Sequence, residues 1–141
     1  MVVFSGTYQH TVDSKNRLFI PAKFRELLGE SFMIMQNVEG CLDIITAQSR
    51  DAIVEKLSLL PRSQTAKIKR FLFSAAGDCT PDSQGRVVVP KQLVEFAGLE
   101  KNVLIIGAGD HIEIWNEERF ENNISAMTNE SLADEMSALQ W

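Results

Sequence analysis

The sequence predicts an α+β fold in which two similar halves form one compact unit. The first observation is an internal repeat: D-S-K-N-R-L-F-I-P begins at Asp13, and D-S-Q-G-R-V-V-V-P begins at Asp82, 69 residues later. The second is that short β-rich runs alternate with short helical patterns in both halves. The third is a chain of 141 residues with 45% hydrophobic and 23% charged side chains, a composition typical of one globular domain.

Each half is expected to present the same elements in the same order. An extended segment, at about 3–11 and 75–80, leads into the D-S-x-x-R loop. The apolar runs Leu18–Ile20 and Val87–Val89 then predict short strands. Short helices follow, with the proline in the first helical turn and a glycine in the left-handed position after the end, and we expect them at Pro21–Leu28 (Gly29) and Pro90–Ala97 (Gly98).

A β-hairpin and a closing helix complete each half. The predicted hairpin strands are 32–36 with 42–46 and 103–106 with 111–115, and the helices follow at about 47–59 and 116–127. The match between the two hairpins has an offset of 70, because Leu42-Asp43-Ile44 corresponds to Ile112-Glu113-Ile114.

A further helix is expected between the halves, and a short amphipathic stripe ends the chain. Pro61 and a capping Ser63 would start the linker helix, which carries apolar residues on one face (Ile68, Phe71, Leu72). Leu132, Met136 and Leu139 form the C-terminal stripe, which would either contact a partner or cover its own domain. The predicted division is a first repeat at 1–60, a helical linker at 61–74, a second repeat at 75–127 and a tail at 128–141.

The D-S-x-x-R loops have a physical reason to adopt one turn. An Asp at the start of a tight connection accepts hydrogen bonds from backbone N–H groups two or three residues later. The fourth position is Asn16 in one loop and Gly85 in the other, the residue types that best tolerate positive φ. The Asp can also pair with the Arg, so one interpretation is purely structural. The other is that the loop presents its arginine to a ligand.

The distribution of charge favours an anionic partner, although the net charge of −5 argues against one at first sight. Residues 1–29 carry a net charge of +2 and residues 61–91 a net charge of +4. Residues 30–60 and 92–141 carry −3 and −8. Positive charge therefore gathers around the two loops and the linker, on an otherwise acidic chain.

The two D-x-x-x-R motifs, each followed by three apolar residues and proline, resemble the MraZ family of bacterial transcriptional regulators. The segments Arg70–Phe73, Val103–Gly107 and Ile112–Trp115 also look like this family, and the likeness covers essentially the whole chain. The resemblance implies two swapped-hairpin, AbrB-like β-barrel halves and a ring-like homo-oligomer. It also implies binding to direct repeats of double-stranded DNA in the promoter of the division and cell-wall gene cluster, and a place in the cytoplasm with the nucleoid.

The resemblance also implies which residues act. We expect DNA contacts from Ser14, Lys15, Asn16, Arg17, Lys23, Arg25 and Arg86, with Asp13 and Asp82 orienting the loops. Arg17 or Lys15 would donate to guanine in the major groove, whereas Lys23 and Arg25 would contact phosphates. The second loop has Gln84 and Gly85 in place of Lys15 and Asn16, which leaves its equal participation open.

Other classes of function find little support. The sequence has no nucleophile elbow, P-loop or H-E-x-x-H motif, so we expect no enzyme, no catalytic residues, no small-molecule substrate and no cofactor. Cys41 and Cys79 have no metal-ligand spacing and are expected to be reduced core residues. No apolar run predicts a membrane span or a secretory signal. The alternative is a protein-binding scaffold or antitoxin-like module that acts through the acidic C-terminal third.

Overall fold

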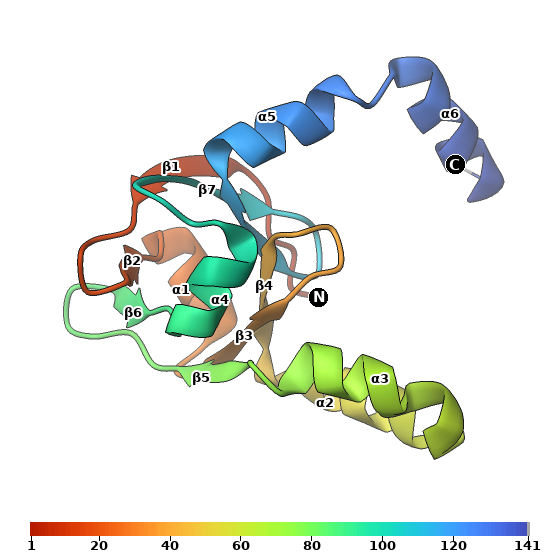
Figure 1. Ribbon diagram of the computed structural model, residues 1–141, viewed down its shortest axis with the longest axis horizontal. Coiled ribbons are helices and arrows are strands. Elements are labelled where there is room, and N and C mark those ends of the chain that lie inside the picture. The colour runs from red at the N-terminus through yellow and green to blue at the C-terminus, as the bar shows by residue number, and fades with distance from the viewer. Residues whose placement is uncertain (141) are drawn as a thin grey trace.

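The computed structural model describes residues 1–140 and has the predicted α+β class (Figure 1). Its main sheet is antiparallel, with the strand order β1-β7-β8-β4-β3-β5. These strands are β1 (Thr7–Thr11), β3 (Phe32–Gln36), β4 (Leu42–Thr46), β5 (Gly77–Cys79), β7 (Asn102–Gly107) and β8 (Ile112–Asn116). A separate two-stranded ribbon pairs β2 (Arg17–Phe19) with β6 (Arg86–Val88).

The two halves exchange strands. β1 of the first half pairs with β7 of the second, and β5 of the second half pairs with β3 of the first. The ribbon likewise takes one strand from each half, and the two hairpins meet where β4 pairs with β8. Neither half therefore completes its sheet alone, because its lead-in strand lies in the sheet of the other.

The core follows the internal repeat. Leu18 and Ile20 are fully buried, as are their counterparts Val87 and Val89 within a few percent, because alternate residues of a strand face the same side. The short helices α1 (Ala22–Leu28) and α4 (Lys91–Ala97) bury Phe24 and Leu93, again 69 residues apart, against the same cluster. Equivalent positions of the repeat thus fill one shared core. The intervening residue of each ribbon strand is left facing outward.

Helix starts differ from the prediction in detail. Pro21 and Pro90 have ψ near 140°, so each is the residue before the helix rather than part of its first turn. The extended conformation is dictated by the strand that precedes each proline. Ser63 is not a cap: α3 (Arg62–Phe73) begins one residue earlier, after Pro61, and has no side-chain cap. Gly98 adopts the expected left-handed conformation, whereas Gly29 has a positive φ of 83° with an extended ψ.

Two pairs of helices extend from this body. α2 (Ala47–Ser58) and α3 form one arm, and α5 (Glu117–Ser125) and α6 (Asn129–Ala138) form the other (Figure 1). The predicted C-terminal stripe is helical in α6, which starts with a capping box at Thr128, while Trp141 lies outside the described residues. α5 and α6 bury none of their described residues. No helix in residues 1–140 is long and apolar enough to cross a bilayer.

Candidate nucleic-acid interface

The first D-x-x-x-R loop is organised by its aspartate. Oδ1 of Asp13 accepts hydrogen bonds from the backbone N–H groups of Lys15 (2.9 Å) and Arg17 (2.8 Å). Oδ2 accepts a third from Nε of Arg17 at 2.6 Å. Asn16 has a φ of 58°, and its N–H donates to the carbonyl of Asp13. The expected acceptor role and ion pair are present, although the second backbone donor is four residues on rather than three.

The second loop repeats this geometry. Asp82 accepts from the N–H groups of Gln84 and Arg86, both at 2.9 Å, and from Nε of Arg86 at 3.0 Å. Gly85 has a φ of 80°, as the sequence predicts for this position. One turn is therefore built twice, from Asn in one copy and Gly in the other.

The two loops are connected through the ribbon. Ile20 N–H donates to the carbonyl of Gly85 at 2.9 Å, and Val89 N–H donates to the carbonyl of Asn16 at 2.8 Å. The antiparallel pairing of Arg17 with Val88 and of Phe19 with Arg86 continues these bonds. Both loops consequently lie on the same side of the molecule, held by one element (Figure 1).

Both arginines keep donors free. Within the described residues the hydrogen bonds of Arg17 and Arg86 use only Nε, so the two terminal nitrogens of each guanidinium are available. The backbone N–H of Arg17 is the main cause that lowers the pKa of Asp13, and that of Arg86 lowers the pKa of Asp82 in the same way. Both aspartates are therefore ionised near neutral pH, and each fixes its arginine by charge as well as by geometry.

Arg25 belongs to the first half but lies against the second loop. Its Nε donates to the carbonyl of Ile20 at 2.8 Å, and its guanidinium lies 5.4 Å from the centre of the Phe19 ring. A Cβ atom on Gly85 would be only 2.7 Å from Cζ of Arg25. The structure therefore brings Arg25 to the loop of Asp82 and Arg86.

The remaining predicted residues differ in position. Ser14 and Lys15 are exposed at the tip of the first loop. Lys23 is exposed on α1, and Nζ lies 3.4 Å from Oγ of Ser5, so its polar contact in the described chain is with the N-terminal segment. Of the two basic residues on α1, Arg25 therefore joins the loops and Lys23 does not.

Sequence reasoning missed the apolar part of this surface. Val88 is 63% exposed on the ribbon, between the two loops. Phe19, opposite it in the other strand, contacts Arg25 and lies 5.2 Å from the ring of His10. The strict alternation of buried and exposed residues in the two apolar runs is the signal that would have found them.

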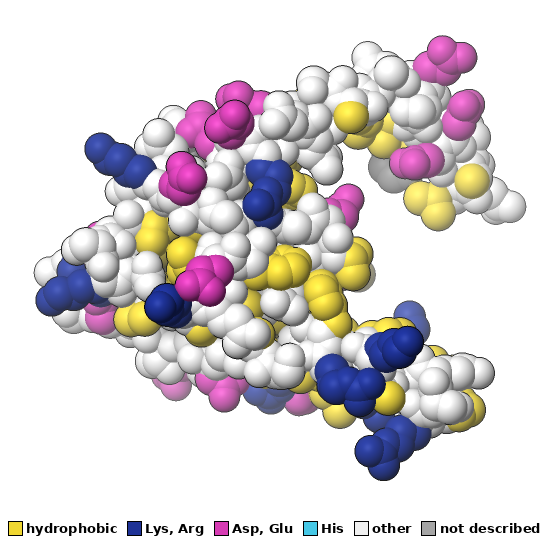
Figure 2. Space-filling view, viewed as in Figure 1, with side chains coloured by type: hydrophobic (Ala, Val, Ile, Leu, Met, Phe, Trp, Pro, Cys, Tyr) yellow, Lys and Arg dark blue, Asp and Glu magenta, His cyan; other side chains and the backbone are white. Residues whose placement is uncertain are grey.

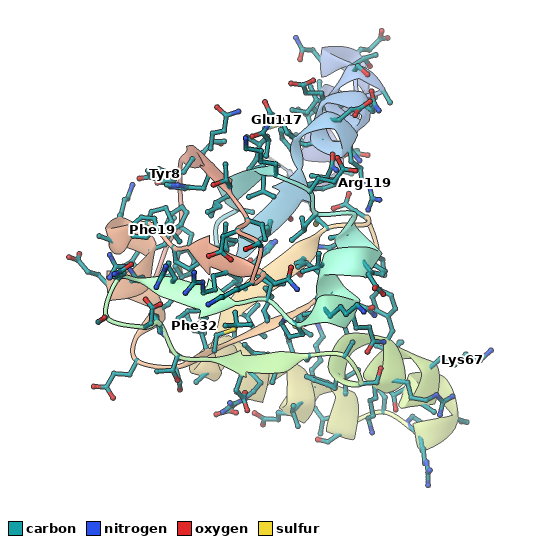
Figure 3. The ribbon with its side chains drawn as sticks, turned by 60° about the vertical axis from the view of Figure 1, so that its left-hand side comes forward. Tyr8, Phe19, Phe32, Lys67, Glu117 and Arg119 are labelled. Atoms are coloured by element: carbon teal, nitrogen blue, oxygen red, sulfur yellow. The ribbon has the colours of Figure 1, made fainter. Side chains whose placement is uncertain are left out.

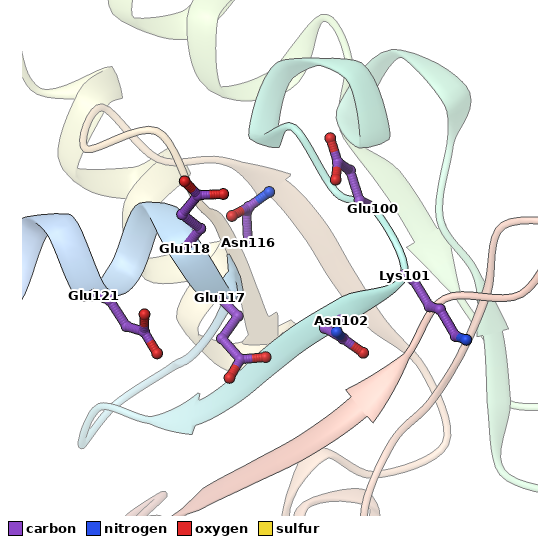
Figure 4. A pocket seen from close by; sticks show the side chains of 7 residues that line it. All are labelled: Glu100, Lys101, Asn102, Asn116, Glu117, Glu118 and Glu121. Atoms are coloured by element: carbon purple, nitrogen blue, oxygen red, sulfur yellow. The ribbon is translucent and has the colours of Figure 1, made fainter.

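Charge is separated across the molecule. Figure 2 shows Lys and Arg at the loop end and over the α2–α3 arm, whereas Asp and Glu lie over α5 and α6. The basic residues of the linker therefore do not join the loops, and Figure 3 shows Lys67 of α3 far from Phe19 of the ribbon. A cavity of about 330 Å³ at the start of α5 is lined by four glutamates, Glu100, Glu117, Glu118 and Glu121 (Figure 4), and it repels an anionic ligand.

The sequence model of the family described as "MraZ protein, putative antitoxin-like" matches residues 3–69 and 72–140. The chain belongs to the MraZ family. A protein of Heliobacterium modesticaldum named transcriptional regulator MraZ is 44% identical over 95% of this chain and 96% of its own. A protein of the same name from Carboxydothermus hydrogenoformans is 41% identical over the same shares, and one from Clostridium acetobutylicum is 39% identical over 97% and 99%. The MraZ resemblance expected from the two D-x-x-x-R motifs is thus confirmed, and it covers nearly the full length of these relatives.

Proposed function

We propose that this protein is a transcriptional regulator that binds double-stranded DNA sequence-specifically, through its first D-x-x-x-R loop. The observation that carries the proposal is the state of Arg17: its Nε is held by Asp13, while both terminal nitrogens are free in the described chain. A fixed guanidinium with two free donors matches the O6 and N7 acceptors of guanine in the major groove. The relatives' name, transcriptional regulator MraZ, supports the same function.

The residues around Arg17 have complementary roles in the proposal. Lys15 and Ser14 at the exposed loop tip contact a base edge or the neighbouring phosphates, and Asn16 contributes its amide. Lys23 contacts a phosphate from α1. Asp13 does not touch DNA but positions Arg17, as Asp82 positions Arg86.

The second loop has a smaller part. Arg86 offers the same free donors as Arg17, but Gln84 replaces Lys15, so the loop brings one positive charge fewer. Arg25 compensates in part, because its guanidinium lies beside Gly85. We propose that this pair contacts the sugar–phosphate backbone.

Affinity requires several subunits. A single loop reaches only a few base pairs, and linking several weak contacts raises the overall affinity by effective concentration. We propose a ring-like homo-oligomer that places its loops on direct repeats upstream of the division and cell-wall gene cluster. The helical arms support it, because α5 and α6 bury none of their described residues within the chain and expose Ile124 (45%) and Met127 (48%). The repeats at 1–60 and 75–127, with the linker at 61–74 and the tail at 128–141, would then form one subunit.

The test compares four variants on two DNAs. Wild type, Arg17→Ala, Arg86→Ala and Arg50→Ala are titrated against a labelled promoter fragment with direct repeats and a scrambled fragment. Arg50 is the matched control, since it is an arginine on α2 that pairs only with its neighbour Asp51. We expect Arg17→Ala to weaken binding to the repeats by about 10- to 100-fold, Arg86→Ala to weaken it less, and Arg50→Ala to match wild type. Wild-type affinity in the Arg17→Ala variant would refute the proposal.

The alternative is a protein-directed role for the acidic C-terminal third. The exposed α5–α6 arm carries seven acidic residues and one arginine, and the printed family description includes an antitoxin-like character. This alternative predicts that the purified protein binds no DNA at any salt concentration. The DNA-binding function predicts affinity that falls steeply as salt is added.

A further inference from the structure

Two short segments of the repeat carry side chains that the proposed DNA interface does not use. Cys41-Leu42-Asp43 precedes and begins β4, and His111-Ile112-Glu113 precedes and begins β8. They are equivalent, since Cys41 and His111 are 70 residues apart, as are Asp43 and Glu113. Each half of the chain thus supplies one nitrogen or sulfur donor followed two residues later by a carboxylate.

The sheet brings these four side chains to one face. Residues i and i+2 of a strand point to the same side, so the two side chains of each segment share a face. β4 and β8 pair antiparallel with Asp43 directly opposite Glu113. The intervening Leu42, Ile44, Ile112 and Ile114 belong to the core, which places the hairpin cluster (Cys41, Asp43, His111 and Glu113) on the opposite face.

The donor atoms lie within the reach of a single ion. Sγ of Cys41 and carboxylate oxygens of Asp43 and Glu113 all lie within 4.8 Å of one another. Nε2 of His111 is 2.8 Å from Oε2 of Glu113 and 3.6 Å from Oδ1 of Asp43. Cys41 is 0% exposed, and its thiol has no hydrogen-bond partner among the described residues, so a buried sulfur faces this group without a protein ligand.

Each of the other donors is oriented from behind. Nδ1 of His111 is 2.6 Å from Oδ1 of Asp110, which leaves Nε2 directed at the cluster. Trp115 Nε1 donates to Oε1 of Glu113 at 2.9 Å, and Asn37 Nδ2 donates to Oδ1 of Asp43 at 3.0 Å. A carboxylate on the far nitrogen of a histidine, and hydrogen bonds to ligating carboxylates, are the outer-shell contacts that metal sites use.

The cluster is also accessible and strongly acidic. A cavity of about 410 Å³ between the sheet and α2 is lined by Asp43, Asp110 and His111, which gives a path from solvent. Three carboxylates surround one imidazole, so the local charge is favourable for a cation. Burial raises the pKa of the Cys41 thiol, so its proton would leave to solvent as the sulfur coordinates.

We propose that the hairpin cluster is a site for a tetrahedral divalent cation of the zinc type, with one ligand atom each from Cys41, Asp43, His111 and Glu113. Zinc binds sulfur, imidazole nitrogen and carboxylate oxygen in four-coordinate sites, and four protein ligands make the site structural. The two ligand pairs come from the two halves. The ion therefore joins the hairpins at the centre of the sheet and stabilises the subunit.

The test uses full-length, tag-free protein stripped of metal with EDTA. Zn²⁺ binding is measured by calorimetry, and Co²⁺ serves as a spectroscopic probe because thiolate coordination gives a charge-transfer band and tetrahedral geometry gives intense visible bands. We expect one ion per chain and a thiolate band in wild type. Cys41→Ser removes that band, and His111→Gln weakens Zn²⁺ binding by more than the roughly 10- to 100-fold that loss of an outer-shell partner costs.

The chain supplies its own matched controls. Cys79 is the other buried free cysteine and His10 the other histidine, and neither belongs to the cluster. Cys79→Ser and His10→Gln are expected to bind Zn²⁺ like wild type. Absence of Zn²⁺ binding in wild type, Co²⁺ binding without a thiolate band, or loss of the band in Cys79→Ser would each overturn the proposal. If Cys41→Ser does not fold, the wild-type Co²⁺ spectrum and the Cys79→Ser variant still decide it.

Discussion

The guanidinium of Arg25 fills the space that a side chain at Gly85 would need. A Cβ atom at position 85 would lie 2.7 Å from Cζ and 2.8 Å from Nε of Arg25. The equivalent position of the first loop is Asn16, and the residue equivalent to Arg25 is Val94. The two loops therefore differ as pairs: where one has Asn in the turn, the other has glycine and a neighbouring arginine.

This relationship predicts that Gly85→Asn destabilises the protein because of Arg25. Asn tolerates positive φ, as Asn16 does at 58°, so the backbone itself costs little. The contact with Arg25 should lower the free energy of unfolding by about 1–3 kcal/mol. In an Arg25→Ala background the penalty should fall below about 1 kcal/mol, because the obstructing guanidinium is gone. Urea unfolding of the four proteins measures both values, and an equal penalty in the two backgrounds would show that Arg25 is not the cause.

Asp13→Ala is predicted to weaken binding to promoter repeats although Asp13 does not contact DNA. It removes all three hydrogen bonds that hold the loop and Arg17, so the guanidinium must be ordered when DNA binds. We expect a loss of about tenfold in affinity, with a smaller loss for Asp82→Ala in the second loop. Fluorescence anisotropy with labelled repeats measures both. A larger effect from Asp82→Ala would assign the principal role to the second loop.

The salt dependence of binding should identify the phosphate contacts. If Lys23 contacts a phosphate, Lys23→Ala reduces the slope of log affinity against log salt by about 1 per bound subunit and weakens repeats and scrambled DNA alike. Lys67→Ala is the matched control, because Lys67 lies on the α3 arm away from the loops (Figure 3). The prediction fails if the two lysine variants have the same slope.

Arg119 is predicted to hold the two halves together. Its Nη1 donates to the carbonyl of Gly40, in the first hairpin, at 2.7 Å and to that of Phe96, at the end of α4, at 3.3 Å. Since Arg119 is exposed, Arg119→Ala should lower the free energy of unfolding by only about 1 kcal/mol. Arg50→Ala, which loses only a contact with its neighbour, should stay within about 0.5 kcal/mol of wild type. Chemical denaturation distinguishes the two, and equal stabilities would argue against a bridging role.

The loops were the part of the site that the sequence could predict. The turn at Asp13 and the turn at Asp82 are closed by hydrogen bonds within five residues, so residue types alone specify the aspartate acceptor, the positive φ and the ion pair. The position of Arg25 could not be predicted in this way. It depends on α1 of one half packing beside the loop of the other, a contact across 60 residues of chain.

The sequence by itself determined the repeat, the α+β class, the order of elements and the family, because these depend on local pattern and on similarity along the chain. Only the tertiary structure decided that the halves exchange β1 and β5, that β2 pairs with β6, and that Cys41 meets His111 across β4 and β8. Strand pairing is a choice among partners of similar local character. It is settled by which arrangement buries Leu18, Val87 and their neighbours in one shared core.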